Sequence, residues 1–196
     1  MEVKIFLRDI NKSIAKAWKT EFVGYKNVNI SNGDIFDIQA DAIISPANSF
    51  GFMDGGIDLV YSYYFGWDLQ KRLQEKIATH YFGELPVGMA TIIETNNENI
   101  KYLISCPTMR VPENVSNTVN SYLAFRAGLI EIIKHNKNHP NNEIKSVLCP
   151  GLGTCVGRMS PEKCAKQMRF AYDSIIDNNY DFPKELIFAQ KMHYEL

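Results

Sequence analysis

Short apolar segments alternate with longer amphipathic segments along the whole sequence, and this alternation limits the possible folds more than any other feature. Apolar runs of strand length occur at residues 3–7, 28–30, 42–44, 89–94, 102–106, 146–149 and 186–189. Helical spacing of apolar residues marks the segments between most of them. Strands separated by helices predict an α/β fold, a three-layer α/β/α domain around a mixed, largely parallel central sheet. The run at 186–189 is expected to be the last strand.

Helix boundaries are also indicated by local signals. Two helices are expected near residues 57–65 and 68–81. Ser116 is a candidate N-cap for a long helix, and Ser160 followed by Pro161 is typical of another helix start. The 196 residues contain no linker, repeat or low-complexity tract, so residues 1–196 are predicted to form a single domain.

The charge balance excludes several classes of function. The formal net charge is −1, and acidic and basic residues are mixed along the chain. Clustered Lys and Arg, which long nucleic acids require, are missing, so no extended basic nucleic-acid surface is expected. No apolar stretch reaches the roughly 18 residues of a membrane span, and the N-terminus does not resemble a signal peptide. We therefore expect a cytoplasmic protein without membrane contact.

The cysteines and histidines do not suggest a metal or a cofactor. Cys106, Cys149, Cys155 and Cys164 form no CxxC pair, and the four histidines show no ligand spacing. Buried thiols in a reducing compartment are expected instead.

A first glycine-rich loop follows the apolar run at 42–44. It extends from Asn48 to Gly56 and leads into a predicted helix. Gly55 and Gly56 permit close approach to the main chain, and the helix start supplies free N–H groups for an anion. The Asn48 amide can both donate and accept, which suits a ribose diol. A tight turn without a ligand is the alternative interpretation.

A second glycine-rich loop follows the run at 146–149. Gly151, Gly153 and Gly157 precede the helix start at Ser160. The spacing is one residue too long for the dinucleotide motif GxGxxG. Because ligands bind at the carboxyl ends of parallel strands, we expect the two loops to meet there. Their backbone donors would form a cleft for a diphosphate between two sugars.

A third candidate is the turn Gly33-Asp34-Ile35 after the run at 28–30. The Asp34 carboxylate could accept a hydrogen bond from an exocyclic amine. It could equally form an Asx-turn that holds the loop.

These three elements, in this order, resemble the macro domain family. The quoted matches are Gly33-Asp34-Ile35, then Ser45-Pro46-Ala47-Asn48 with Gly55-Gly56-Ile57-Asp58, then the loop 151–157. The resemblance covers residues 28–189. It implies that the partner is ADP-ribose or a related adenine nucleotide derivative, or an ADP-ribosylated macromolecule.

The resemblance also implies a role for each site residue. Asp34 and the Ile35 backbone would bind adenine, and Asn48 would lie near the distal ribose. Asp58 would place a catalytic carboxylate close to that ribose. The diphosphate would be bound by the backbones of Gly55, Gly56, Ile57, Gly151, Gly153, Thr154, Cys155, Val156 and Gly157.

The sequence departs from the family pattern at several positions. Ser45 replaces the first Asn of Asn-Ala-Ala-Asn and Pro46 the first Ala. Asp54 stands where many members have glycine, and Cys155-Val156 replace a common aromatic residue. These departures bear on affinity and catalytic rate more than on the fold.

Other residues have two interpretations each. The aromatic segment 58–69 is either a helix packed on the sheet or a rim that contacts a substrate carrier. Arg110 pairs either with a phosphate or with a surface carboxylate. Phe188, Tyr194 and Tyr180 are candidates for stacking on adenine.

The resemblance implies hydrolysis of an ADP-ribosyl linkage at the distal ribose, with Asp58 and Asn48 as the catalytic residues. Asp58 would orient or deprotonate the attacking water. The alternatives are a non-catalytic ADP-ribose reader, a phosphatase acting on ADP-ribose-1″-phosphate, and an interaction protein with empty loops.

Overall fold

A six-stranded sheet forms the centre of the fold in the computed structural model, which describes residues 3–179 and 182–196. The strand order is β2-β1-β6-β3-β5-β4, and every neighbouring pair is parallel except β4 with β5. The strands are β1 (Lys4–Asp9), β2 (Val28–Asn32), β3 (Ala42–Ser45), β4 (Thr91–Glu94), β5 (Tyr102–Ser105) and β6 (Ser146–Cys149). The predicted mixed, largely parallel sheet is confirmed.

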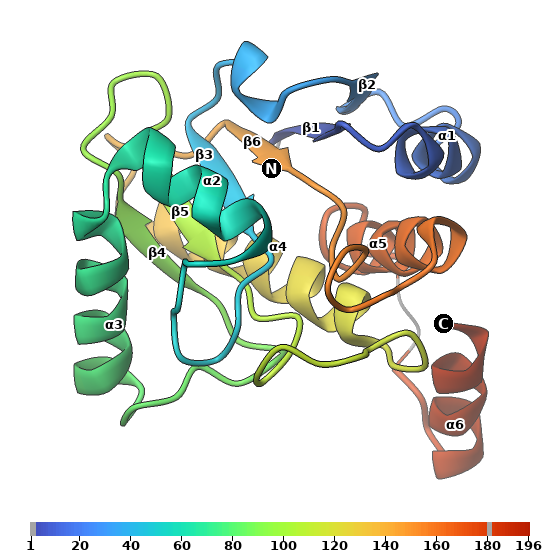
Figure 1. The fold of residues 1–196 in the computed structure, drawn as a ribbon. Coiled ribbons are helices and arrows are strands. Elements are labelled where there is room, and N and C mark those ends of the chain that lie inside the picture. Colours follow the sequence, from blue (N-terminus) through green and yellow to red (C-terminus); the bar gives the residue numbers. More distant parts are fainter. Residues whose placement is uncertain (1–2, 180–181) are drawn as a thin grey trace.

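Helices cover both faces of this sheet (Figure 1). On one face lie α1 (Lys12–Glu21), α4 (Asn120–Asn138) and α5 (Pro161–Ile175), and on the other lie α2 (Gly56–Phe65) and α3 (Asp68–His80). Alternate strand residues face opposite layers: Ile44 packs with the first group of helices and Ile43 with the second. The three-layer α/β/α arrangement is therefore the predicted one.

Local signals account for two of the helix starts. The Asn11 side chain caps α1 by accepting from the Ser13 amide. The Ser160 side chain caps α5 by accepting from the Lys163 amide, and Pro161 is the first helical residue.

The predicted start of the long helix at Ser116 is wrong. Helix α4 begins at Asn120, and its N-cap is Val119. The Ser116 amide instead donates to the Asn114 side chain, and the Val115 amide donates to the Gly157 carbonyl. Because Val115 is buried against the loop after β6, long-range packing holds this segment outside the helix.

The predicted last strand at 186–189 is also wrong, because this segment lies in helix α6 (Leu186–Glu195). The edge strand β4 is covered by α3, because Lys76 and Arg72 of this helix donate to the carbonyls of Ile92 and Glu94. Figure 1 shows α6 beyond α5, away from the sheet, and none of its residues is buried. None of the helices in the described ranges is both long and apolar enough to cross a bilayer.

Candidate functional site

The candidate site lies at the edge of the sheet where the parallel strands end. Strands β3 and β6 are parallel neighbours, with Ala42 opposite Val147, so the two glycine loops after them start side by side. Strands β1 and β2 are parallel to β6 and end at the same edge. Asp9 and the turn at 33–37 therefore belong to this edge as well, as expected for a doubly wound sheet.

The loop after β6 is held in a fixed shape by its own backbone. The Met159 amide donates to the Gly153 carbonyl at 2.9 Å. Gly153 has a φ of +70°, which favours glycine, and a Cβ on Gly157 would lie only 2.6 Å from the Gly153 oxygen. The Ser121 hydroxyl donates to the Leu152 carbonyl and ties the loop to α4. The glycines are thus required by the shape of the loop.

Most backbone N–H groups of this loop have no protein acceptor. Among the described residues, no partner is found for the amides of the segment 153–157. The Gly151 amide differs, because the Asp9 carboxylate accepts from it at 3.0 Å. The run of free donors therefore begins at Gly153. Cys155 and Val156 are exposed at its centre, so Cys155 departs from the expected buried thiol. The other three thiols are buried as expected.

The loop after β3 leads into the open N-terminus of α2. The Asn48 side chain holds this loop: its oxygen accepts from the amides of Phe50 and Phe52, and its nitrogen donates to the Phe52 carbonyl. One N–H of the Asn48 amide remains available for a ligand. Gly55 is the N-cap of α2 without a side-chain cap. The first amides of α2 are therefore free to bind an anion.

Asp58 lies in the first turn of α2 and is buried, with 5% of its surface exposed. Its carboxylate accepts a hydrogen bond from the Ser45 hydroxyl at 2.6 Å. Burial raises the pKa of Asp58 to about 7, and the bond from Ser45 opposes this shift only in part. A carboxylate with this pKa exchanges its proton near neutral pH, as a general acid or base must.

The turn after β2 has the geometry of an Asx-turn, which is the second of the two interpretations given for Asp34. The Asp34 carboxylate accepts from the Phe36 amide at 3.0 Å, an Asx-turn. The Arg8 guanidinium donates to the Asp34 carbonyl and pairs with Asp37. The second carboxylate oxygen of Asp34 has no partner among the described residues. Ile35 is buried directly behind the turn.

Several other expected contacts lie elsewhere in the structure. Arg110 forms a two-point pair with the Glu84 carboxylate, at 2.8 and 3.1 Å. Of its two expected partners, a phosphate or a surface carboxylate, the structure therefore shows the carboxylate. Phe188 and Tyr194 are exposed on α6 rather than on a strand of the sheet. Tyr180 lies outside the described residues.

Part of the aromatic segment 58–69 packs on the sheet, and part of it is exposed at the surface. Tyr61 is buried, and its hydroxyl donates to the Ile44 carbonyl. Tyr63 and Trp67 are exposed and contact each other edge to face. Tyr64 stacks on Phe36 at a ring separation of 3.7 Å and so joins α2 to the turn after β2.

Sequence reasoning missed Arg8, Asp9 and Ser121 as residues that shape the site. Each lies more than twenty residues from the loop it contacts, and Asp9 is 142 residues from Gly151. One available signal was the position of Arg8 and Asp9 at the end of the first apolar run. Their partners depend on strand order, which the sequence pattern does not contain.

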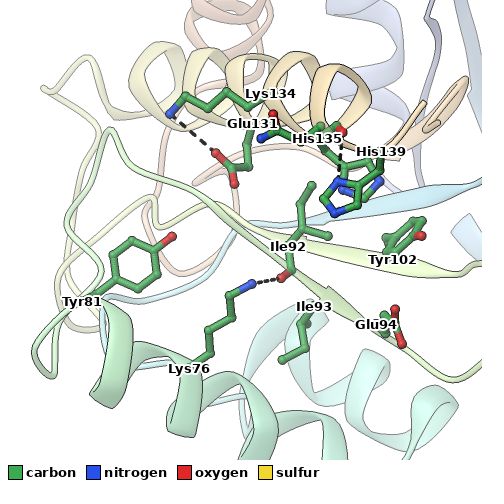
Figure 2. Close-up of a pocket in the computed structure, with 11 residues that line it drawn as sticks. Lys76, Tyr81, Ile92, Ile93, Glu94, Tyr102, Glu131, Lys134, His135 and His139 are labelled. Atoms are coloured by element: carbon green, nitrogen blue, oxygen red, sulfur yellow. Dashed lines mark hydrogen bonds and ion pairs between the residues drawn. The ribbon is translucent and has the colours of Figure 1, made fainter. Parts of the chain in front are cut away.

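A hollow of about 550 Å³ lies away from both glycine loops. Figure 2 shows it across β4, between α3 and α4, with Lys76, Glu131 and His135 among its lining residues. Its charged side chains have both signs, and the Lys76 ammonium is bonded to the Ile92 carbonyl at 2.6 Å. This hollow includes no residue of either loop, so the loops remain the candidate site.

Among the described residues, no three His, Cys, Asp or Glu side chains gather as metal ligands would.

The fold and the loops define a class of protein: a three-layer α/β/α domain with backbone donors gathered at the carboxyl edge of its sheet. The profile of the macro domain family matches residues 44–168. The chain belongs to the macro domain family. It is 31% identical over 142 residues to an uncharacterised protein of Aquifex aeolicus, covering 72% of this chain and 78% of that one. An uncharacterised protein of Aeropyrum pernix is 27% identical over 156 residues, covering 80% and 74%.

Three solved structures illustrate the similarity in fold. The macrodomain of Mycobacterium tuberculosis DarG has a TM-score of 0.56 and 21% identity, and the match covers 74% of this chain and 88% of that one. The Oceanobacillus iheyensis macrodomain with ADP has a TM-score of 0.61 and 19% identity, covering 83% and 87%. Thermosipho africanus DarTG in complex with ADP-ribose has a TM-score of 0.56 and 19% identity, covering 75% and 38%.

Proposed function

We propose that the protein binds ADP-ribose through these two loops and hydrolyses an ADP-ribosyl linkage at the distal ribose. The observation that carries the proposal is the run of free backbone amides in the loop 153–157 after β6, together with the uncapped start of α2 after the neighbouring strand β3. Two sets of N–H donors from neighbouring strand ends suit a diphosphate and need little net positive charge. A structural relative with ADP-ribose and another with ADP support this ligand class.

The remaining contacts would orient the two ends of the ligand. The free carboxylate oxygen of Asp34 would accept from the adenine amine, and the remaining N–H of Asn48 would donate to a distal ribose hydroxyl. Asp9 already occupies the Gly151 amide, so the diphosphate would be held mainly by the donors from Gly153 onward.

Asp58 would act as the general base. It would take a proton from a water molecule, and the water oxygen would form a bond to the anomeric carbon as the bond to the carrier breaks. The carrier atom would leave with the electron pair of that bond and take up a proton from solvent. Its raised pKa, about 7, supports a base that is partly ionised at neutral pH. We expect turnover to rise with pH until Asp58 is fully ionised.

The Asp58→Asn variant tests this role, because it keeps the shape of the side chain and removes the base. We expect the rate of hydrolysis of an ADP-ribosylated substrate to fall about 10² to 10⁴-fold. The dissociation constant for ADP-ribose, measured by calorimetry, should change little, because a group that acts on the chemical step contributes mainly to kcat.

Asp68→Asn is the matched control, since Asp68 also lies in the first turn of a helix but its carboxylate is exposed. It should bind and turn over as the wild type does. An unchanged rate in Asp58→Asn would remove Asp58 from the mechanism. Binding by the wild type without any turnover would make the protein an ADP-ribose reader. Release of phosphate from ADP-ribose-1″-phosphate would identify a phosphatase instead.

A further inference from the structure

A row of buried hydroxyl groups crosses the sheet beside Asp58. Ser45 is opposite Ser105 in the parallel pair β3 and β5, and Ser105 is opposite Thr91 in the antiparallel pair β5 and β4. All three residues are at most 1% exposed. The first member of the row, Ser45, donates to the Asp58 carboxylate at 2.6 Å.

The three side chains point to the same face of the sheet. Side chains two residues apart on a strand share a face. Ile43, Leu103 and Ile93 each lie two residues from a row member, and all three pack in the core beneath α2 and α3. The row therefore lies on the face of the sheet that is covered by α3 and by α2, the helix that carries Asp58.

Two of these hydroxyls have no protein partner. The Oγ of Ser105 and the Oγ1 of Thr91 are buried, and neither forms a hydrogen bond with any described residue. Unpaired buried hydroxyls are uncommon, and the usual partner in a native protein is an ordered water. Directly opposite side chains are about 5 Å apart at Cβ, a gap that one water at about 2.8 Å from each hydroxyl spans.

We propose that ordered water joins the hydroxyls of Thr91, Ser105 and Ser45 into one hydrogen-bonded row that ends on Asp58 and fixes the orientation of its carboxylate. Each hydroxyl or water in the row donates toward Asp58, so each bond polarises the next. Ser105 and Thr91 are then positioning residues that act through Ser45. Their effect on turnover rests on the proposed function, whereas their effect on the Asp58 carboxylate does not.

Two other buried titratable groups of this region add no charge while Asp58 titrates. Tyr61 of α2 and Cys149 at the end of β6 are both buried, and burial raises the pKa of each. Both are neutral over the range in which Asp58 titrates. Asp9, at the end of β1, acts on Tyr61 through its charge.

The titration of Asp58, followed by ¹³C NMR of its carboxyl carbon, tests the row. The signal is assigned with Asp58→Asn. Because the row stabilises the ionised carboxylate, Ser45→Ala should raise the midpoint by about one pH unit or more. Ser105→Ala should raise the midpoint by a smaller amount, and Thr91→Val by a still smaller one. The acidic limb of the profile of kcat against pH should shift to higher pH together with the midpoint in each variant.

Ser62→Ala is the control, since Ser62 is a buried hydroxyl of the same helix that donates to Met53 outside the row. It should leave the midpoint unchanged. An unmoved midpoint in Ser105→Ala would overturn the proposal, and so would a crystal structure without water density between Ser105 and Ser45. If Ser45→Ala does not fold, Ser45→Thr keeps a hydroxyl, and the variants at Ser105 and Thr91 still decide.

The two proposals fail in different ways. If Asp58→Asn leaves hydrolysis unchanged while Ser105→Ala moves the Asp58 midpoint, the row exists and the catalytic role is wrong. If Asp58→Asn abolishes turnover and Ser105→Ala moves neither the midpoint nor the kcat profile, Asp58 is catalytic and the row is wrong.

Discussion

Asp58 combines two requirements that oppose each other. Its position in the first turn of α2 places a carboxylate near the free amides of the site, but the packing of α2 on the sheet removes that carboxylate from water. Burial of the charged form is unfavourable, and the single bond from Ser45 compensates only partly. At the scale of the residue, the candidate catalytic group therefore reduces the stability of the fold.

The cost of this carboxylate should appear in the pH dependence of stability. The pKa of Asp58 is about 7 in the folded protein, compared with an ordinary value of 3.8, so the folded state binds this proton more tightly than the unfolded state. The Asp58 contribution to the free energy of unfolding therefore falls as the pH rises from about 4 to about 7. Above that range the loss is on the order of 4 kcal/mol.

Asp58→Asn removes the titration and should be more stable than the wild type at pH 8, with little difference at pH 4. Urea unfolding of both proteins between pH 4 and pH 8 measures this directly. Equal stabilities across the range would mean that the carboxylate is well solvated.

At the scale of the element, the loop after β6 is shaped by contacts that leave no room for a side chain at Gly157. An added Cβ would lie 2.6 Å from the Gly153 oxygen and 2.5 Å from a methyl carbon of Val115. The first neighbour is backbone, so relief requires a shift of the loop itself. Such a shift would move the free amides that the proposed diphosphate site uses.

Gly157→Ala should therefore weaken ADP-ribose binding by about tenfold or more, equivalent to about 1.4 kcal/mol. Overpacking of this kind also costs about 1–3 kcal/mol of stability. Calorimetry and urea unfolding measure the two effects. Val156→Ala trims an exposed side chain in the same loop and is expected to bind as the wild type does. Unchanged affinity in Gly157→Ala would exclude this loop from the ligand site.

At the scale of the whole molecule, two helix layers bury the core of the domain: α1, α4 and α5 on one face of the sheet, and α2 and α3 on the other. Helix α6 contributes no buried residue to this core. Several of its large apolar side chains, including Leu186, Ile187 and Tyr194, are more than half exposed. Because burial of apolar area is the main source of stability, α6 contributes little to the domain.

Deletion of residues 184–196 should lower the free energy of unfolding by less than about 1 kcal/mol. By contrast, Trp18→Ala, which empties a fully buried position, should cost about 3–5 kcal/mol. Urea unfolding compares the three proteins. A loss in the deletion variant as large as that in Trp18→Ala would show that α6 packs on the domain in solution.

The sequence is enough to predict the fold class, the strands β1 to β6 within a few residues, and the glycine loops that follow β3 and β6. These features depend on local chemistry: apolar periodicity, the cap at Ser160 and the backbone freedom of glycine are written in neighbouring residues. The segment at 186–189 was misjudged because a short apolar run has the same composition in a strand and in a helix.

The contacts between distant residues, by contrast, depend on how the whole chain folds. The order of the strands brings Asp9 to the Gly151 amide and aligns Ser45, Ser105 and Thr91 across three strands. Packing of α2 on the sheet, rather than any motif, buries Asp58 and raises its pKa. Contacts and burial of this kind depend on the position of every layer at once, so no local stretch of sequence encodes them.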